Sequence, residues 1–342
     1  MLFFRNDYGQ GCIPEILEQM NQSNMQSHVG YGEDEICMHA KQLIQSKMVD
    51  HTVDVHFISG GTLTNQTVIK SMLRPFEAVI SCDTGHIATH ETGAIEATGH
   101  KVITVQNVNG KLTPALIQKS FDEHMLTYEH LVYPKMVYIS NATEFGTVYT
   151  REELTALHEK CQELGLYLYM DGARLGAALM SGIDYSLNDL AAWCDVFYIG
   201  GTKVGAMMGE AVVFSGMKAP KYFFTNVKRH GALLAKGRML GIQFDTLFTD
   251  ELYFKISRHA IAMATRIRSI FEKHGIAIAY DSPTNQQFVV LSPALYEAIS
   301  QKVAFEIWER KSEHEIICRF VTSWATKEEE LDELDRILQS YA

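Results

Sequence analysis

Residues 195–205 read Asp-Val-Phe-Tyr-Ile-Gly-Gly-Thr-Lys-Val-Gly, and this stretch decides the fold. The apolar run Val196–Ile199 is typical of a strand buried on both faces, as in a parallel sheet. Glycines on both sides of Lys203 indicate that the chain there passes close to something that tolerates no side chain. A lysine directly after such a strand is poorly placed to be an ordinary solvated lysine.

A second apolar run, Leu166–Met170, lies upstream and is followed by Asp171 and Arg174. Because the carboxyl ends of parallel strands meet at one edge of a sheet, we expect Asp171 to lie near Lys203. An acid and an amine in this arrangement suit pyridoxal 5'-phosphate (PLP), which requires a Schiff-base amine and a carboxylate for its pyridine nitrogen. The alternative is a local Asp171–Arg174 salt bridge at the start of a helix.

Short apolar runs alternate with amphipathic stretches along most of the chain, which predicts an α/β fold with a mostly parallel central sheet and helices on both faces. The predicted strands are Val53–Ile58, Ala78–Ser81, Lys101–Val105, Met136–Ser140, Leu166–Met170, Val196–Ile199 and Ala211–Phe214. Between two of them, Arg151–Leu164 has helical spacing of apolar residues, and Thr150 begins a capping box.

The pattern changes after about residue 245, where strands and helices no longer alternate one for one. The segments there are a long helical stretch 251–274, apolar runs at 277–280, 288–292 and 315–323, and a charged helix 327–340. We therefore predict a large domain over residues 1–248 and a smaller C-terminal α+β domain over residues 249–342.

The bulk composition is that of a soluble globular enzyme of 342 residues, with 21% charged and 46% hydrophobic residues. Thirty basic and 41 acidic residues give a net charge of −11, which argues against nucleic acid as a partner. Six scattered cysteines without metal-ligand spacing indicate reduced thiols and a cytoplasmic location. We identify neither a signal peptide nor an apolar stretch long enough to cross a membrane.

Two further segments carry groups suited to chemistry. Gly60, Gly61 and Thr62 end a predicted strand and open a helix, so their amides and one hydroxyl could bind phosphate, although neither common phosphate fingerprint is present. His86 follows another predicted strand, where an imidazole can stack on a planar ring or move a proton. The spacing His86-x-x-x-His90-Glu91 could instead suggest a metal site. It does not supply a third well-placed ligand, and we predict no metal.

These motifs, in their order and spacing, resemble the threonine aldolase group of the β-eliminating lyases, which are PLP enzymes of the aspartate aminotransferase fold. The resemblance covers nearly the whole chain. The segments that carry it are Phe4–Tyr8, Gly30–Asp34, Ser59–Asn65, His86 with Glu91 and Gly93, Thr143–Tyr149, Met170–Leu175, Gly200–Lys203 and Arg319–Trp324.

The resemblance implies a role for each matching residue. Lys203 would form the Schiff base with PLP, Asp171 would pair with the pyridine nitrogen, and Arg174 would bond the phenolic oxygen side. His86 would stack on the ring, while Gly61 and Thr62, with Gly60, would hold the phosphate. The implied substrate-binding residues are Asn6, Tyr31 and Arg319, with Arg319 taking the carboxylate as a bidentate fork.

The resemblance also implies an N-terminal arm over residues 1–30, and a homodimer or homotetramer whose sites lie at the subunit interface. Tyr31 would then enter the site from a neighbouring subunit, as would a basic residue between Lys228 and Arg238. Some members of the group carry a histidine near the substrate β-hydroxyl, where this chain has Thr143 or Glu144.

The implied activity is aldol cleavage of L-threonine, L-allo-threonine and related β-hydroxy-α-amino acids to glycine and an aldehyde, through a quinonoid intermediate. His86 is the first candidate for moving the β-hydroxyl proton. The main alternative is a β-eliminating lyase that acts on an aromatic or sulfur amino acid and releases pyruvate and ammonia. A catalytically inactive binding protein and a nucleotide-binding α/β protein are more distant alternatives.

Overall fold

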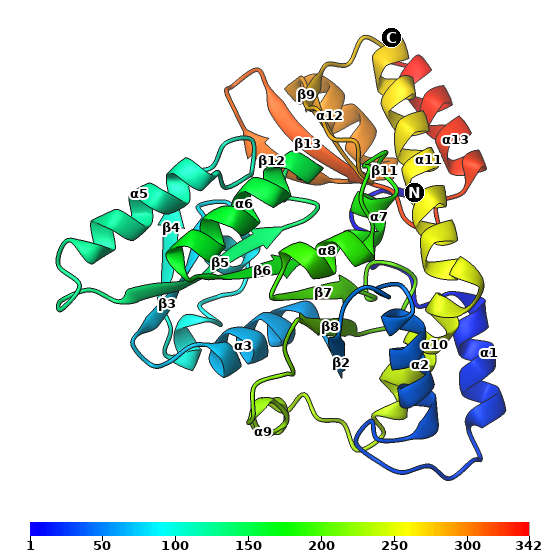
Figure 1. Ribbon diagram of the computed structural model, residues 1–342. Coiled ribbons are helices and arrows are strands. Elements are labelled where there is room, and N and C mark those ends of the chain that lie inside the picture. Colours follow the sequence, from blue (N-terminus) through cyan, green and yellow to red (C-terminus); the bar gives the residue numbers. More distant parts are fainter. Residues whose placement is uncertain (342) are drawn as a thin grey trace.

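The computed structural model describes residues 1–341. Its main element is a seven-stranded sheet (Figure 1), whose strands lie in the order β2 (Val53–Ile58), β8 (Glu210–Ser215), β7 (Val196–Gly200), β6 (Tyr167–Asp171), β5 (Tyr133–Ser140), β3 (Glu77–Cys82) and β4 (Val102–Val105). The five strands from β7 to β4 are parallel, and β8 pairs antiparallel with both β2 and β7. The predicted mostly parallel sheet is confirmed.

Helices cover both faces of this sheet, as Figure 1 shows with α5, α6 and α8 on one side and α3 on the other. The elements around the sheet are α3 (Gly61–Met72), α4 (His86–Thr89), η1 (Glu96–Thr98), α5 (Pro114–Met125), α6 (Arg151–Leu164), α7 (Leu175–Leu179), α8 (Leu187–Trp193) and α9 (Phe223–Arg229). Successive residues of β5 enter two cores. Val137 and Ile139 join the core that contains α6, and Met136 and Tyr138 join the one that contains α3. Because both faces are buried, the strands have continuous apolar sequences.

The helix α6 begins and ends as its sequence predicts. The Thr150 hydroxyl accepts the Glu153 amide at 3.2 Å, and the Glu153 carboxylate accepts the Thr150 amide at 2.8 Å. These two bonds form the predicted capping box. At the other end, Gly165 adopts a φ of 65°, a left-handed conformation that glycine adopts without strain.

Near the N-terminus, β1 (Leu2–Phe3), α1 (Pro14–Ser23) and α2 (Glu35–Gln45) precede the sheet, and α10 (Arg238–Phe248) packs on α2. A Cβ atom on Gly241 of α10 would lie 2.4 Å from the Cys37 sulfur of α2. The close approach of these two helices therefore requires glycine at this position.

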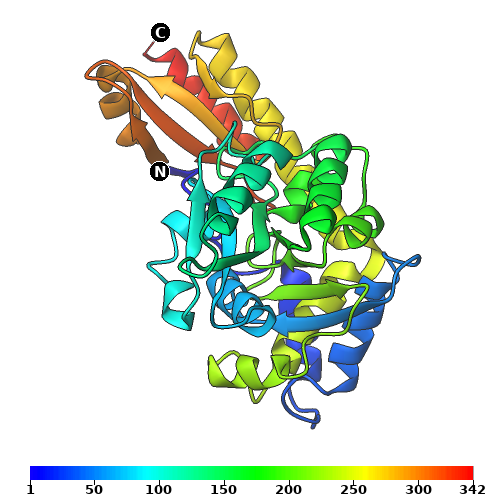
Figure 2. The same cartoon turned by 60° about the vertical axis from the view of Figure 1, so that its left-hand side comes forward.

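The C-terminal region has a core of its own. After η2 (Thr249–Glu251), the long helix α11 (Leu252–Lys273) and α13 (Glu328–Gln339) lie against a four-stranded antiparallel sheet (Figure 2). Its strands are β12 (Glu306–Arg310), β13 (Ile316–Val321), β10 (Gln286–Leu291) and β9 (Ile278–Tyr280), in that order. The core includes Phe271, Phe320 and Leu334. The predicted C-terminal α+β region is confirmed.

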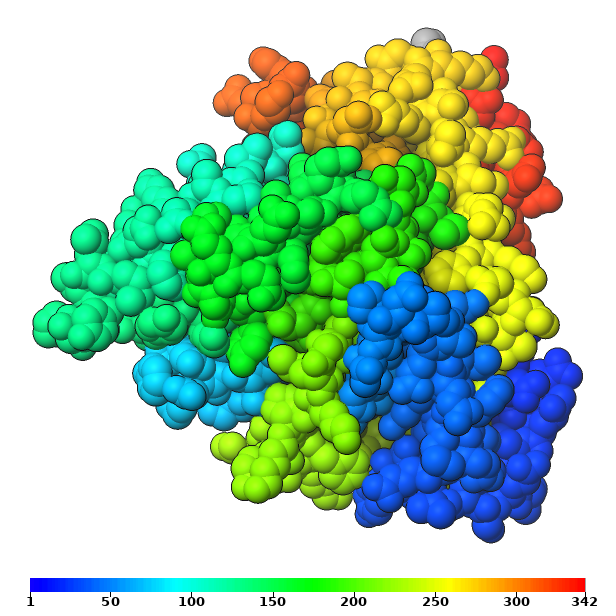
Figure 3. Space-filling view, viewed as in Figure 1, coloured from blue at the N-terminus to red at the C-terminus, as the bar shows by residue number. Residues whose placement is uncertain are grey.

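The chain start lies against this C-terminal region. β1 pairs in parallel with β11 (Val303–Ala304), which follows α12 (Pro293–Ser300), and Phe4 is buried in the C-terminal core. In Figure 3 the remaining N-terminal segments, in blue, lie at the other end of the molecule, next to the start of α11 in yellow. Within residues 1–341, no helix is both long and apolar enough to cross a membrane.

Candidate active site

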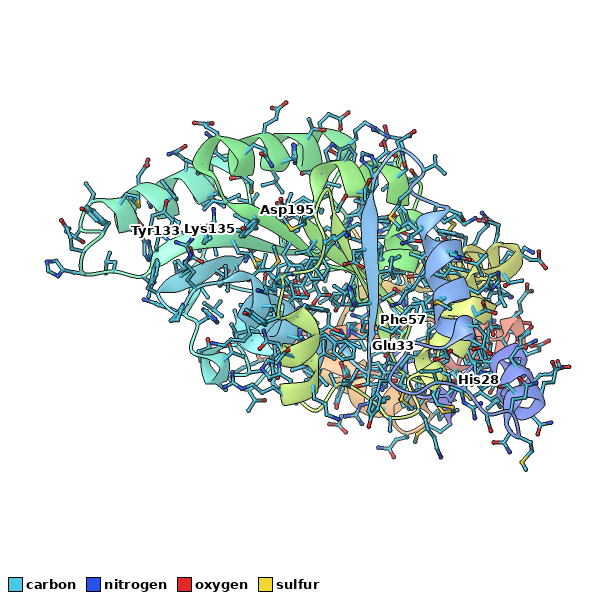
Figure 4. The ribbon with its side chains drawn as sticks, turned by 60° about the horizontal axis from the view of Figure 1, so that its bottom comes forward. His28, Glu33, Phe57, Tyr133, Lys135 and Asp195 are labelled. Carbon is cyan, nitrogen blue, oxygen red and sulfur yellow. The ribbon has the colours of Figure 1, made fainter. Side chains whose placement is uncertain are left out.

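A cavity of about 370 Å³ lies at the carboxyl edge of the parallel strands. β6 ends at Asp171, β7 ends shortly before Lys203, and β3 ends shortly before His86, so three strands bring side chains to this edge. The opposite edge of the sheet is marked in Figure 4 by Lys135 in β5 and Asp195 just before β7. In open parallel sheets, ligands bind outside the carboxyl ends of the strands.

The structure brings together all seven residues that the resemblance assigns to cofactor binding. All of them line this cavity, and they are Gly60, Gly61, Thr62, His86, Asp171, Arg174 and Lys203. The three predicted substrate-binding residues, Asn6, Tyr31 and Arg319, are not among its lining residues where the described chain places them. The seven lie at or after the ends of four strands, β2, β3, β6 and β7, so the fold rather than sequence proximity assembles them.

Lys203 follows a tight turn after β7. A Cβ atom on Gly201 would lie 2.6 Å from the Gly209 carbonyl oxygen, which explains why the turn needs glycine there. The Lys203 amine lies 6.0 Å from the centre of the Tyr8 ring. Burial lowers the pKa of Lys203 below its ordinary value, and the charge of Arg174 lowers it further. A larger share of the amine is therefore uncharged and able to act as a nucleophile.

Glu210, which the sequence analysis did not single out, holds the Lys203 turn. Its carboxylate accepts the Gly201 amide at 3.0 Å and the Thr202 hydroxyl at 2.8 Å. Burial raises the pKa of Glu210 to about 8, although these two hydrogen bonds oppose the rise. A buried glutamic acid beside Lys203 is thus protonated over much of the neutral range.

The variant Glu210→Gln tests this raised pKa. Because the folded protein keeps a proton that the unfolded chain releases, the stability that Glu210 contributes is complete below its ordinary pKa of 4.5 and is lost as the pH rises to about 8. Between about pH 5 and about pH 8, we expect wild type to lose on the order of 3 kcal/mol more stability than the variant. Urea unfolding of both apoproteins at the two pH values measures this difference, and equal losses would contradict the raised pKa.

Three side chains hold the Asp171 carboxylate by hydrogen bonds. Its carboxylate accepts the Tyr138 hydroxyl at 2.6 Å, the Tyr198 hydroxyl at 2.5 Å and the Asn65 amide at 3.1 Å. Burial alone would raise the pKa of Asp171, but the charge of His86 and these hydrogen bonds outweigh it and lower the pKa. The carboxylate therefore stays ionised at neutral pH, as a partner for a protonated nitrogen must.

His86 begins the short helix α4 and is fixed by a buried acid. Its Nδ1 lies 2.8 Å from Oε1 of Glu91, whose side chain is fully buried. Asn65 donates to the same Glu91 oxygen at 2.7 Å and thereby joins His86 to the Asp171 network. The His86 and His90 rings stack 5.6 Å apart. No group of three metal-ligating side chains occurs within residues 1–341.

Arg174 pairs with Asp7 rather than with Asp171. Its Nε and one terminal nitrogen donate to the two Asp7 oxygens at 2.7 and 3.0 Å, and the Asn285 amide donates to Asp7 at 3.0 Å. Burial would raise the pKa of Asp7, but Arg174, Lys203 and the hydrogen bonds lower it. The local Asp171–Arg174 salt bridge is therefore not formed. Asp7 stands in the segment Phe4–Tyr8, which is the signal from which it could have been found.

The candidate phosphate turn lies between β2 and α3. Since α3 begins at Gly61, the Gly61 and Thr62 amides are among the first of the helix and have no partner within it. A Cβ atom on Gly61 would lie 3.3 Å from the Tyr198 hydroxyl, which donates to Asp171. Helix amides, the helix dipole and the Thr62 hydroxyl together suit an anion such as phosphate.

Arg319, in β13, is half-buried on the side of the C-terminal region. It donates to Gln286 at 2.9 Å, forms an ion pair with Glu306 and lies 5.2 Å from the Trp308 ring centre. Its Nε is buried and has no hydrogen-bond partner. The charge of Arg319 contributes to lowering the pKa of His90, after the larger effects of burial and His86.

Asn6 and Tyr31 have local partners. The Asn6 side-chain oxygen accepts the Tyr8 amide at 3.1 Å. Tyr31 has a positive φ of 64°, is 46% exposed and lies 4.9 Å from the Lys228 amine. It lines a separate cavity of about 180 Å³, together with His56 and Phe224 among others. Within one chain, Tyr31 and Lys228 are therefore neighbours of each other and not of Lys203.

The sequence pattern of the beta-eliminating lyase family matches residues 4–294. The chain belongs to this family. The lyase is 32% identical to a protein of a Pseudomonas species named low specificity L-threonine aldolase, over 97% of this chain and 95% of that protein. It is 30% identical to a protein of the same name from Pseudomonas aeruginosa, over 97% and 96% of the two chains.

Solved structures give the same assignment. The lyase matches the Leishmania major threonine aldolase with a TM-score of 0.95 and 43% identity, over 100% of this chain and 99% of that one. It matches a mutant of Thermus thermophilus aspartate aminotransferase with a TM-score of 0.73, over 100% and 92% of the chains, and at 15% identity this match shows the fold alone. The predicted aspartate aminotransferase-like fold, the resemblance to threonine aldolases and the prediction of a lyase are confirmed.

Proposed function

We propose that this lyase cleaves L-threonine, L-allo-threonine and related β-hydroxy-α-amino acids to glycine and an aldehyde, with PLP as its cofactor. The observation that carries the proposal is the convergence of a lysine of lowered pKa, an ionised buried aspartate and a helix N-terminus on one cavity. The relatives named threonine aldolase support the choice of reaction.

The residues of the cavity fit PLP. The turn at Gly60–Thr62 offers donors for the phosphate, and Asp171 offers a carboxylate to the pyridine nitrogen. Lys203 supplies the amine for the covalent link. When bound to an amino acid, PLP accepts the electron pair released by a bond at Cα.

The protein groups around the cofactor site have distinct proposed tasks. Asp171, held by Tyr138 and Tyr198, keeps a proton on the pyridine nitrogen. His86, oriented by Glu91, covers one face of the ring. Arg174 is held by Asp7 and would offer its remaining donor atoms to the phenolic oxygen side of the cofactor.

At the substrate end, we propose that Arg319 binds the carboxylate. A guanidinium that lies against Trp308 and keeps an unpaired Nε is suited to this task, because a carboxylate can take two parallel hydrogen bonds from it. The Glu306 carboxylate pairs with this guanidinium and would be exchanged for the carboxylate of the substrate. Asn6, next to Asp7, is the third proposed substrate-binding residue.

We further propose a cytoplasmic homodimer or homotetramer in which Tyr31 and a residue between Lys228 and Arg238 enter the site of a neighbouring subunit. Support comes from the exposed aromatic residues in this part of the surface, which are Tyr31, Tyr222 and Phe224. We also propose a domain boundary between residues 248 and 249, because the strands after it have their own apolar core.

A product assay tests the proposed function. Purified protein loaded with PLP is incubated with L-threonine, L-allo-threonine and their D isomers, and with aromatic and sulfur amino acids. We expect glycine and acetaldehyde in equal amounts from L-threonine, L-allo-threonine or both, with little pyruvate. Pyruvate and ammonia without glycine would replace the proposal with β-elimination.

A further inference from the structure

Glu144 lines the same cavity as Lys203 and Asp171, at the end of β5. One oxygen, Oε1, accepts the Ser140 hydroxyl at 2.7 Å and the His86 backbone amide at 2.9 Å. These two bonds come from the ends of different strands and fix the carboxyl group. Its orientation is therefore set before any ligand enters.

The second oxygen of Glu144 has no partner. Oε2 is buried and forms no hydrogen bond with any group of residues 1–341. A buried polar atom left in this state costs about 1–3 kcal/mol, so protein sites that keep one commonly use it. Since the residue lines the cavity, a donor on the ligand can supply the missing bond.

The neighbouring side chains are already occupied. The Thr143 hydroxyl shares a 2.7 Å hydrogen bond with Thr147 and is almost fully buried. His86 Nδ1 is engaged by Glu91, which leaves Nε2 free, but the proposed place of this ring is against the cofactor face. Among these candidates, Glu144 is the group whose unpaired acceptor atom is buried.

We infer that Glu144, rather than His86, is the catalytic group that takes the proton of the substrate β-hydroxyl. The inference rests on the proposed function, because PLP held in this cavity and joined to the substrate amine would supply the electron acceptor for the bond that breaks. Burial supports it by raising the pKa of Glu144 above its ordinary value, more than the Ser140 hydrogen bond lowers it. A carboxylate with a raised pKa is a better base.

The proton and electron balance of the step is simple. Oε2 of Glu144 takes the hydroxyl proton, the oxygen–hydrogen electron pair becomes the second bond of the aldehyde carbonyl, and the Cα–Cβ bond breaks. Its electron pair remains with the glycine carbon, which then gains a proton. Because Glu144 afterwards releases its own proton to water, the reaction needs no oxidant, reductant or co-substrate.

The variant Glu144→Gln separates this role from the other tasks of the site. A glutamine oxygen can still accept the Ser140 and His86 donors, but the amide cannot take a proton. We expect kcat for threonine cleavage to fall by roughly 10²-fold or more. Exchange of the glycine α-proton with deuterated water, which involves no β-hydroxyl, is expected to stay within about threefold of wild type, as is the Kd for PLP.

The matched control is Glu91→Gln, which also removes a buried carboxylate from the cavity wall. Because Glu91 acts through His86 and Asn65, we expect this variant to lower cleavage and glycine exchange by the same factor. Cleavage by Glu144→Gln within about threefold of wild type, or an equal loss of both reactions in it, would overturn the inference.

Two further results keep the test decisive. If Glu144→Gln fails to fold, Ser140→Ala removes one donor from Oε1 instead, and we expect it to lower cleavage several times more than glycine exchange. Equal effects of Ser140→Ala on both reactions would overturn the inference. A wild-type protein that exchanges the glycine α-proton but cleaves no β-hydroxy amino acid would instead refute the proposed function.

Discussion

Replacement of Lys203 by alanine is expected to abolish covalent attachment of PLP and to lower threonine cleavage by roughly 10³-fold or more. No other lysine lines the cavity at the carboxyl edge of the sheet, within the residues that the structure describes. Borohydride reduction followed by mass spectrometry of the peptides measures the attachment. The wild-type peptide that contains Lys203 should gain the mass of the reduced cofactor, and the variant should give no modified peptide.

Lys160→Ala is the control for this experiment. Lys160 lies on α6 and pairs with Glu163 on the surface, so its loss should leave both the modified peptide and turnover as in wild type. Cofactor trapped on another lysine of wild type, or full turnover by Lys203→Ala, would refute the assignment of Lys203.

Asp171→Asn is expected to retain PLP and to lower turnover by roughly 10³-fold. The amide oxygen can accept one of the two tyrosine hydroxyls, and the other hydroxyl can accept from the amide nitrogen, but the side chain carries no charge to keep the pyridine nitrogen protonated. Loss of turnover with little change in the Kd for PLP is the expected combination. Titration of the apoprotein with PLP and steady-state kinetics measure the two quantities.

Asp195→Asn provides the comparison at the opposite edge of the sheet. Asp195 accepts the Leu168 amide at 2.8 Å, and desolvation raises its pKa, so this variant also changes a half-buried carboxyl group next to a strand. It should alter stability without a large change in kcat. Similar kinetic losses in the two variants would show that the effect of Asp171→Asn is structural.

The sequence predicted the central sheet well because both of its faces are buried. Val53–Ile58 was predicted with the bounds of β2, and the other six runs overlap their strands closely. The strand β12 was not predicted. It reads Glu-Ile-Trp-Glu-Arg and lies at the edge of the C-terminal sheet, where charged residues are common and the apolar signal is weak.

The site was predictable to the extent that its residues follow strands. Asp171, Lys203 and His86 could be proposed from their positions after apolar runs. Asp7 follows no such run, and its partner Arg174 lies 167 residues away along the chain, so only the resemblance of the segment Phe4–Tyr8 could have pointed to it. Tyr138 and Tyr198 stand inside apolar runs and suggest ordinary core residues, until the structure shows both hydroxyls on Asp171.

The Asp7–Arg174–Asn285 contact has a practical consequence for work with this enzyme. Asp7 connects the start of the chain to both the large sheet and the C-terminal region through buried bonds. Loss of the first seven residues to a protease would therefore disturb the active centre, and Met1, at the start of this segment, is 86% exposed.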